Sequence, residues 1–354
     1  MTPQGAGGAP NVLTVFGGLG PGALSGAERM GWRTTEHLAR RGLRMAVLTD
    51  AERPSDLLDV PWPVYGSAAE LPHEGPGFRP DIVHVYDLAM PAHAALGRDL
   101  ARRFGARLAI TPASAPGAWP DRGLGARLCA EAHVVYALTA AETRALRSLC
   151  DLPVRVVGLP QAPDLTGQPD AGRFRREHRL DGRIVLFLGR KLAAKGYRTL
   201  LAAAPLVWRH SPDTTFVFCG PEAEPGANEA FRQARDGRIR DLGVLTDQAK
   251  HDALAACDVL ALPSTLDVFP LVFAEAWWCG KPVLSGGFDG ADKVVRDGVD
   301  GLVVEPQPVE VADALVRLLT DDDLRTALGA AGRSRVRGGM GWDRVAQAVA
   351  AGYR

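Results

Sequence analysis

The feature that most constrains the fold of this chain is a regular alternation of two patterns. Short apolar runs rich in β-branched residues alternate with longer stretches of helical spacing over most of the 354 residues. This is typical of parallel sheets, because parallel neighbours need long crossover connections, which are usually helices. The length fits two domains of roughly 150 to 200 residues each. We therefore predict an α/β protein of two Rossmann-like, doubly wound parallel-sheet domains facing a central cleft.

The expected strands form two series, separated by residues 158–172, which are rich in Pro, Gly and Asp and lack a period. This stretch is interpreted as the crossing between an N-terminal domain, 1–160, and a C-terminal domain, 161–340. Residues 341–354 have the spacing of a last helix that could pack across both domains. The strands are expected at 12–16, 44–49, 81–86, 107–111, 133–138 and 154–157, and at 183–188, 214–219, 238–242, 259–262, 282–284 and 301–304.

Charge and hydropathy argue against several classes of partner. The chain has 41 basic and 41 acidic residues, so no global field would draw it to nucleic acid. The N-terminus lacks the pattern of a signal peptide and no apolar run is long enough to span a membrane, so a cytoplasmic location is expected. Arg98, Arg102, Arg103 and Arg107 could touch acidic lipid headgroups. A solvated helix face is the favoured interpretation of these arginines, and the sequence does not indicate an oligomeric state.

The first candidate site is the glycine-rich loop Gly17 to Glu28, which follows the first expected strand and precedes a helix. Glycines let backbone N–H groups approach a ligand, and a helix N-terminus favours an anion. The loop is too long for the dinucleotide fingerprint, and its glycines, including Gly18 and Gly26, have the wrong spacing. A plain flexible loop is the alternative.

The second candidate site is LFLGRKLAAKGY, residues 186–197, where a strand ends at Gly189 and a helix follows. Arg190 and Lys195 stand between them. A strand end, a glycine and two cations at a helix start suit a diphosphate. The alternative is a solvated basic turn, which the third cation, Lys191, favours.

The third candidate site is LDVFPLVFAEAWWCGKPV, residues 266–283. Asp267 follows a strand end, and Glu275 lies within an apolar helix, where an unpaired carboxylate is costly. A buried carboxylate opposite a phosphate site could accept hydrogen bonds from sugar hydroxyls. Capping or a structural ion pair is the alternative.

Other polar residues carry weaker signals. His84, in the apolar strand DIVHVYD, is a candidate contact for an acceptor or sugar, although a lone histidine in such a strand is more often part of a core. The chain has no His-x-x-His or Cys-x-x-Cys set, and Asp321 to Asp323 fits the acidic first turn of a surface helix. We therefore expect no protein-bound metal.

In order along the chain, these segments resemble glycosyltransferase family 4, the retaining enzymes of GT-B fold. The resemblance is strongest over LGRKLAAKG, CDVLALPS, DVFPLVFAEAWWCGKPVLS and VVRDGVDGLVV. It implies that Arg190 and Lys195 hold the donor diphosphate, that Glu275 binds the nucleotide ribose and that Asp267 contacts the donor sugar. It further implies that the backbone at Phe269, Leu271 and Val272 lies beside the diphosphate, and that Gly26, in SGAE at Ser25 to Glu28, belongs to the glycine loop near the phosphates. Gly18, like His84, is a candidate contact for an acceptor or sugar.

Two residues depart from the family pattern. The first acid is Asp267 where glutamate is usual, which shortens its reach by one methylene. The family often places a histidine at the end of the strand 107–111, where this chain has TPAS, Thr111 to Ser114. The role of that histidine is therefore either unfilled or taken by another group.

The resemblance implies a retaining glycosyltransferase that moves a sugar from a UDP- or GDP-sugar to a small-molecule acceptor, in natural-product or glycoconjugate biosynthesis. Arg190, Lys195 and Asp267 are its expected catalytic residues, and it would need no cofactor or metal beyond the nucleotide sugar. A nucleotide-sugar epimerase of the same fold is one alternative, but the additional acid and histidine cluster that it needs is not evident. A non-catalytic partner protein of the same fold is another, suggested by the missing histidine.

Overall fold

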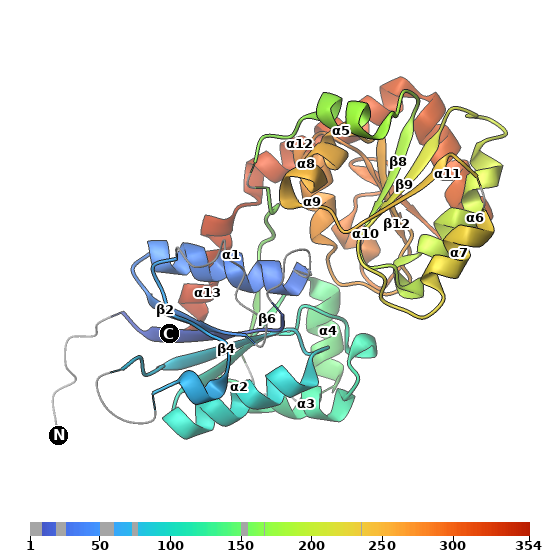
Figure 1. Ribbon diagram of the computed structural model, residues 1–354. Coiled ribbons are helices and arrows are strands. Elements are labelled where there is room, and N and C mark those ends of the chain that lie inside the picture. Colours follow the sequence, from blue (N-terminus) through green and yellow to red (C-terminus); the bar gives the residue numbers. More distant parts are fainter. Residues whose placement is uncertain are drawn as a thin grey trace, which may run out of the picture. The chain divides into compact units, whose positions relative to one another are not determined.

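The computed structural model describes residues 9–18, 26–49, 60–72, 77–149, 155–165, 167–234 and 236–354. Its contacts divide the chain into two compact units. Unit 1 is Met1–Pro160 together with Trp342–Arg354, and unit 2 is Gln161–Gly341. Each unit is a parallel β-sheet covered by helices (Figure 1). The expected pair of Rossmann-like, doubly wound sheets is therefore confirmed.

The sheet of unit 1 has seven strands in the order β3-β2-β1-β4-β5-β6-β7, and all neighbours are parallel. The order runs outward from β1 and β4, so the winding direction switches between them. Its strands are β1 (Asn11–Val15), β2 (Arg44–Leu48), β3 (Val64–Tyr65), β4 (Ile82–Tyr86), β5 (Arg107–Thr111), β6 (Val134–Ala137) and β7 (Arg155–Gly158). Only β3 was not predicted, because a two-residue edge strand is too short to show an alternating pattern.

Helices cover this sheet in two groups. Helix α2 contacts α3, and α3 contacts α4, whereas α1 contacts α13. Their bounds are α1 (Gly26–Arg40), α2 (Pro91–Phe104), α3 (Arg122–Glu131), α4 (Ala140–Leu149) and α13 (Trp342–Gly352). Helix α13 packs closely against the rest of unit 1. The hydroxyl of Tyr136, in β6, donates to the carbonyl of Val349 at 2.6 Å. Gly352 is needed there, because a Cβ at this position would lie 2.3 Å from the same hydroxyl.

Unit 2 has a six-stranded sheet in the order β10-β9-β8-β11-β12-β13, again with parallel neighbours. Its strands are β8 (Ile184–Leu188), β9 (Thr215–Cys219), β10 (Ile239–Gly243), β11 (Val259–Leu262), β12 (Val283–Gly286) and β13 (Gly301–Val304). The central strands β8 and β11 are buried along their whole length, as expected for a sheet covered on both faces. The winding direction switches between them, so the loops after β8 and β11 mark the edge where ligands of such sheets bind.

The helices of unit 2 follow the strands in alternation and then close the unit. They are α5 (Ala171–His178), α6 (Tyr197–Val207), α7 (Ala227–Ala234), α8 (Asp247–Ala256), α9 (Leu271–Trp278), α10 (Ala291–Val294), α11 (Pro308–Thr320) and α12 (Asp322–Gly339). Helix α9 is apolar on nearly all sides because it lies between the sheet and α12. A carboxylate on α9, Glu275, is consequently placed in the interior.

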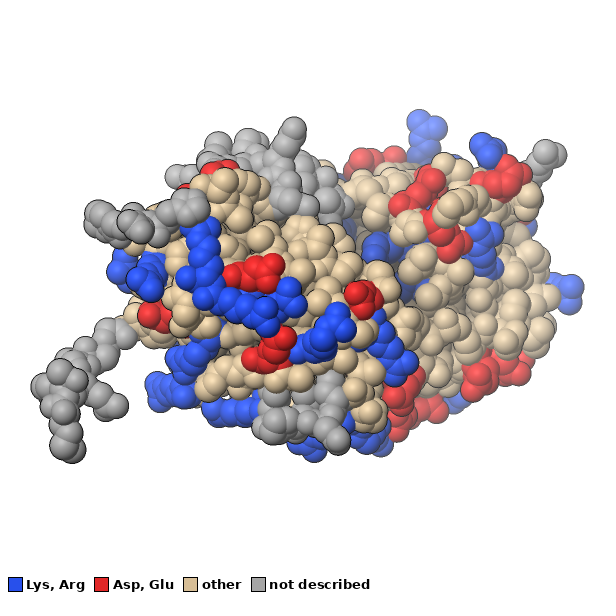
Figure 2. Space-filling view, turned by 90° about the horizontal axis from the view of Figure 1, so that it is seen from below, with Lys and Arg blue, Asp and Glu red and all other residues tan. Residues whose placement is uncertain are grey.

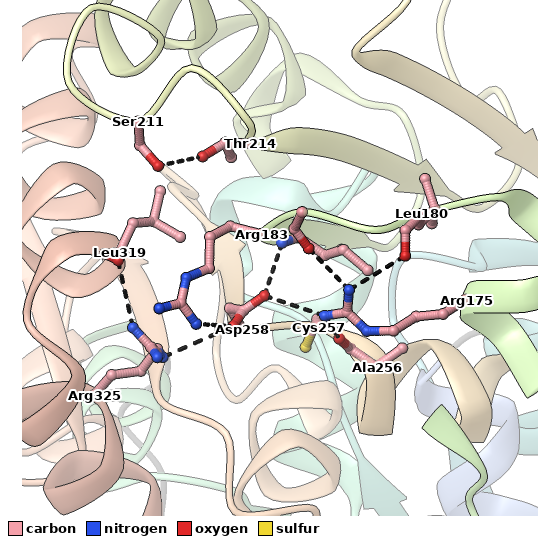
Figure 3. A network of polar contacts seen from close by, with 12 residues as sticks. Arg175, Leu180, Arg183, Ser211, Thr214, Ala256, Cys257, Asp258, Leu319 and Arg325 are labelled. Atoms are coloured by element: carbon pink, nitrogen blue, oxygen red, sulfur yellow. Dashed lines mark hydrogen bonds and ion pairs between the residues drawn. The ribbon is translucent and has the colours of Figure 1, made fainter. Parts of the chain in front are cut away.

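A polar network holds the amino ends of β8 and β11 together (Figure 3). Asp258 is its centre: it accepts from the backbone N–H of Ile184 at 2.8 Å and from Arg183 at 3.1 Å. Arg175 of α5 and Arg325 of α12 approach the same carboxylate at 3.4 and 3.8 Å. One aspartate therefore joins two strands and two helices, on the edge of the sheet opposite to the candidate site.

We expect Asp258→Ala to destabilise unit 2 by about 2 to 4 kcal/mol, because it leaves a buried N–H and several arginines without their shared acceptor. Hydrogen exchange of peptides covering β8 and β11, with urea unfolding of the whole chain, measures the effect. Asp292→Ala is the control, since Asp292 and its partner Lys293 are 67% and 69% exposed. Equal protection of β8 and β11 in both variants would show that the network is not stabilising.

The arginines of α2 do not form a uniform basic surface. Arg98 pairs with Asp99 at 3.0 Å, and Arg102 pairs with Glu131 of α3 at 2.9 Å. Figure 2, seen from below, shows basic side chains with acidic ones among them. The mixed signs fit the favoured interpretation of a solvated helix face. Among the described residues no helix is both long and apolar enough to cross a membrane.

Candidate functional site

The basic loop, residues 190–196, connects β8 to α6 at the carboxyl edge of the sheet of unit 2. Arg190 lies two residues after the end of β8 and is exposed. Lys195 ends a short 3₁₀ turn, Ala193–Lys195, and its side chain is 22% exposed. Lys191 does not face water as the alternative supposed: it is 2% exposed, pairs with Asp241 and lies over the ring of Phe231. Two of the three cations, Arg190 and Lys195, thus remain accessible to an anion.

Neighbouring loops hold the basic loop in one conformation. Glu224 accepts from the backbone N–H of Ala193 at 2.6 Å and from the Tyr197 hydroxyl at 2.8 Å. On the other side, the N–H of Thr265 donates to the carbonyl of Ala194 at 2.9 Å. Gly196 has φ of +81°, and a Cβ there would lie 2.2 Å from the carbonyl oxygen of Pro263. The loop therefore presents its cations from a fixed backbone, which is what an anion site needs.

Asp267 lies directly opposite Lys195. It follows β11 in the turn that leads to α9, and its Oδ2 accepts from Lys195 Nζ at 2.6 Å. The second carboxylate oxygen accepts from the backbone N–H of Val268 at 3.0 Å. The side chain is 9% exposed. The structure thus brings together two residues predicted separately, and the site combines an exposed cation, Arg190, with a neutralised one.

Glu275 lies in the second turn of α9 and is 1% exposed. Its Oε1 accepts from Nζ of Lys250 at 3.1 Å, and Lys250, on α8, is itself 7% exposed. The carboxylate therefore has the structural ion pair that the sequence had left as an alternative to ligand binding. The two roles are compatible, because a carboxylate offers about four acceptor positions and one lysine uses few of them.

The segment between the two acids leads into α9. Phe269 and Leu271 are 9% and 7% exposed, and Val272 is half-buried. Pro270 stands at the N-terminal cap position, where its missing N–H removes no helix hydrogen bond. This helix start lies on the same edge as the basic loop, because β8 and β11 are parallel neighbours.

In unit 1 the glycine loop is described only at its ends. Gly18 is half-buried after β1, and Gly26 is the exposed first residue of α1. Residues 19–25 of this loop lie outside the described residues. The prediction that this loop approaches the donor phosphates therefore stays a prediction.

His84 lies in the middle of β4 and is wholly buried. One ring nitrogen is hydrogen-bonded to the Tyr353 hydroxyl at 2.7 Å and the other to the Thr111 hydroxyl at 2.8 Å. The ring also stacks on Tyr86, with 4.3 Å between centroids. Its position fits the alternative of a core histidine, and it does not fit the expected contact with an acceptor or sugar, because both nitrogens are used internally.

Burial lowers the pKa of His84 from 6.5 to about 3. The unfolded chain then binds a proton that the folded chain refuses, so acidification below about 6.5 destabilises unit 1. Between pH 7 and pH 5 this one group should remove about 2 kcal/mol. The measurement is urea unfolding against pH, compared with His84→Gln, which should have a flatter profile.

Glu142 acts in the opposite direction, since burial raises its pKa to about 8, so stability from this group falls as the pH rises from 4.5 to 8. The difference between wild type and His84→Gln cancels that contribution. His210→Gln, at an exposed position, is the control and should leave the profile unchanged. Identical profiles for all three proteins would contradict the assignment.

The segment Thr111 to Ser114, where the family histidine is missing, is held by polar contacts that the sequence did not reveal. Thr111 bonds to His84, and the Ser114 hydroxyl donates to Asp87 Oδ1 at 2.8 Å. Asp87 and Ala113 have φ of 66° and 56°, in the left-handed region that non-glycine residues seldom adopt. A serine and an aspartate thus occupy this end of β4 and β5.

Sequence reasoning missed three residues of the site in unit 2: Lys250, Asp241 and Glu224. Only Lys250 left a usable signal, because it is one of five lysines in the chain and falls on the apolar side of its helix, three and four positions before Ala253 and Leu254. Within the described residues, no group of three or more His, Cys, Asp or Glu side chains could hold a metal ion.

Comparison with known proteins adds to this geometry. Residues 170–335 match the family described as Glycosyl transferases group 1. A GDP-mannose-dependent alpha-(1-6)-phosphatidylinositol monomannoside mannosyltransferase of Mycobacterium tuberculosis (strain CDC 1551 / Oshkosh) is 36% identical over 192 residues, 50% of this chain and 49% of that protein. A D-inositol 3-phosphate glycosyltransferase of Frankia alni is 34% identical over 257 residues, 66% of this chain and 62% of that protein. The chain thus spans about half the length of the first relative and less than two thirds of the second.

Solved structures resemble the chain over nearly its whole length. Sucrose-phosphate synthase of Thermosynechococcus elongatus gives a TM-score of 0.79 at 22% identity and covers 98% of both chains. Anabaena Alr3699/HepE in complex with UDP and glucose gives 0.78 at 19%, covering 97% of this chain and 98% of that one. At such identities the likeness shows the fold alone, which is GT-B. The residues that match the glycosyl transferases group 1 family make up most of unit 2 and include the basic loop, Asp267 and Glu275.

Proposed function

We propose that this protein is a retaining glycosyltransferase that transfers a sugar from a nucleoside-diphosphate sugar to the hydroxyl of a small acceptor. The observation that carries the proposal is the arrangement at the carboxyl edge of unit 2. A braced basic loop with Arg190 and Lys195 stands on the strand next to the one that leads to Asp267 and Glu275. All four residues lie within the segment that matches the family.

The donor diphosphate is assigned to Arg190 and Lys195. Their charges would meet the two phosphates in the ground state, and they would stabilise the additional negative charge on the leaving diphosphate as the glycosidic bond breaks. Lys195 is the more important of the two. Its present partner, Asp267, keeps its ammonium group in place before the donor arrives.

Asp267 is assigned to the donor sugar and Glu275 to the ribose. Both carboxylates can accept hydrogen bonds from hydroxyl groups. Asp267 precedes helix α9 and Glu275 lies within it, so we place the nucleotide sugar along the start of this helix. Asp267 accepts from Lys195 through one oxygen and from a backbone N–H through the other. This fixes the orientation of the carboxylate and leaves further lone pairs for a sugar hydroxyl.

Retention of configuration is proposed because the motifs of unit 2 resemble a retaining family. Within the described part of the chain we also assign no carboxylate or histidine as an inverting base. In the corresponding front-face reaction, the C1–O bond to the diphosphate breaks and the acceptor oxygen bonds to C1 on the same face. The acceptor proton passes to the departing diphosphate oxygen. The protein's part is to position both substrates and to stabilise the leaving charge.

Donor and acceptor are proposed by class. UDP- and GDP-sugars are the expected donors, and GDP-mannose is the first to test, because a relative at 36% identity is named as GDP-mannose-dependent. Inositol phosphates are the first acceptors to test, because another relative is a D-inositol 3-phosphate glycosyltransferase. We assign the acceptor to unit 1.

The test is incubation of the full chain with a panel of UDP-, GDP-, ADP- and TDP-sugars, with and without inositol phosphates. Released nucleotide and the sugar product are measured, and early product is examined by NMR. We expect release of nucleoside diphosphate and an α-linked product from an α-linked donor. A β-linked product would refute retention. Isomerised free nucleotide sugar would identify an epimerase, and the absence of any turnover or nucleotide binding would favour a non-catalytic partner.

A further inference from the structure

Two further buried charged residues, Lys250 and Asp164, lie beside Glu275 and have no part in the proposed reaction as described so far. Lys250 Nζ donates to Glu275 Oε1 at 3.1 Å and to the carbonyl oxygen of Asp164, also at 3.1 Å. The carboxylate of Asp164 approaches the same ammonium at 3.9 Å. The exposed fractions are 7% for Lys250, 1% for Glu275 and 2% for Asp164. One lysine thus stands between two carboxylates in the interior.

Burial makes this arrangement costly unless it is fully engaged. An ammonium group and a carboxylate lose their hydration in the interior, and only close contacts and further hydrogen bonds offset that loss. Apolar residues in the same places would often be as stable or more stable. Stability alone therefore does not explain why α9, which is otherwise apolar, has a glutamate facing a lysine.

We propose that Lys250 is a positioning residue for nucleotide binding: it holds the Glu275 carboxylate in one orientation for the vicinal hydroxyls of a ribonucleoside diphosphate. The inference rests on the proposed function, because it needs Glu275 to meet the ribose. Lys250 itself does not touch the nucleotide. Without it, a carboxylate that is 1% exposed loses the ammonium group that donates to its Oε1 at 3.1 Å in the interior.

Lys250 restricts the orientation of Glu275 through a chain of contacts. Lys250 binds Oε1, and it is in turn held by the carbonyl of Asp164, which also bonds to His251 Nε2 at 3.2 Å. Lys250 is therefore fixed by a backbone atom as well as by the two acids. A ligand hydroxyl meets a carboxylate whose rotation is already restricted, so less entropy is lost on binding.

The experiment is calorimetric titration of the full chain with UDP or GDP, whichever binds the wild type, and with its 2′,3′-dideoxy analogue. Lys250→Met should weaken the ribonucleoside diphosphate by about tenfold or more, as expected for loss of a charge-assisted bond. Its affinity for the dideoxy analogue should change by less than about threefold, because that ligand has no hydroxyls for Glu275 to bind. Lys293→Met, on the 69% exposed Lys293, is the matched control and should leave both affinities unchanged.

If the wild type binds nucleotide, two results for Lys250→Met would overturn the inference while the proposed function stands. One is an unchanged affinity for the ribonucleoside diphosphate, and the other is an equal weakening of both ligands. A wild type that binds neither UDP nor GDP would refute the proposed function as well. If Lys250→Met does not fold, the inference is tested with the double variant Lys250→Met/Glu275→Gln, which removes both charges. Its affinity should equal that of Glu275→Gln, and a further loss beyond that variant would show that Lys250 acts by another route.

Discussion

Alanine at Arg190 or at Lys195 is expected to lower turnover by about 100- to 1,000-fold, with a smaller effect on donor affinity. The reason is that the charge these side chains meet grows as the diphosphate leaves. Lys195→Ala should be the more damaging, because it also leaves Asp267, 2.6 Å away in the native chain, without its partner. A carboxylate freed in this way would repel the leaving diphosphate. Steady-state kinetics with the donor found in the panel measures both effects.

The double variant Lys195→Ala/Asp267→Ala separates these two contributions. If repulsion by Asp267 adds to the loss, the double variant should be faster than Lys195→Ala despite having one more substitution. Arg176→Ala, at an exposed position on α5, is the matched control and should be as active as the wild type. EDTA should leave the wild-type rate nearly unchanged, since the two cations supply the positive charge. Loss of activity with EDTA and rescue by magnesium or manganese would instead assign charge stabilisation to an ion.

Glu275→Gln is expected to act mainly on nucleotide binding, and Asp267→Ala mainly on turnover. Glu275→Gln should weaken nucleoside diphosphate binding by roughly ten- to a hundredfold, because a charged acceptor for two hydroxyls becomes a neutral amide. Asp267→Ala should depress turnover, since its proposed partner is the sugar. Free nucleoside diphosphate should bind this variant as well as the wild type or better, because Lys195 loses a competing anion.

Calorimetry with the nucleoside diphosphate and kinetics with the complete donor give the two quantities for each variant. Asp292→Ala, an exposed acid on α10, is the common control. Unchanged nucleotide affinity in Glu275→Gln would reduce that residue to a structural carboxylate. Comparable loss of nucleotide affinity in Asp267→Ala would contradict its assignment to the sugar.

The sequence by itself determined the architecture of the two sheets. Every predicted strand forms, because apolar runs buried on both faces of a parallel sheet have a local signature, whereas the two-residue edge strand Val64–Tyr65 has none. The basic loop was also predictable, since a strand end, Gly189 and two cations are neighbours in the chain. The family resemblance carried the roles assigned to Asp267 and Glu275, which spacing alone does not indicate.

Tertiary structure decided what each charged group faces. Lys195 and Asp267 are 72 positions apart, and Lys250 and Glu275 are 25 apart, so no local period could pair them. His84 shows the same limit most clearly: its partner Tyr353 lies 269 positions away, on the segment that returns to unit 1 at the end of the chain. The hydroxyl of that tyrosine satisfies a histidine nitrogen that would otherwise be buried at a cost, and so makes a core residue of one whose sequence context also allowed a ligand contact. Local sequence thus sets where the chain forms strands and helices, whereas the partner that compensates each buried polar group comes from elements that meet only on folding.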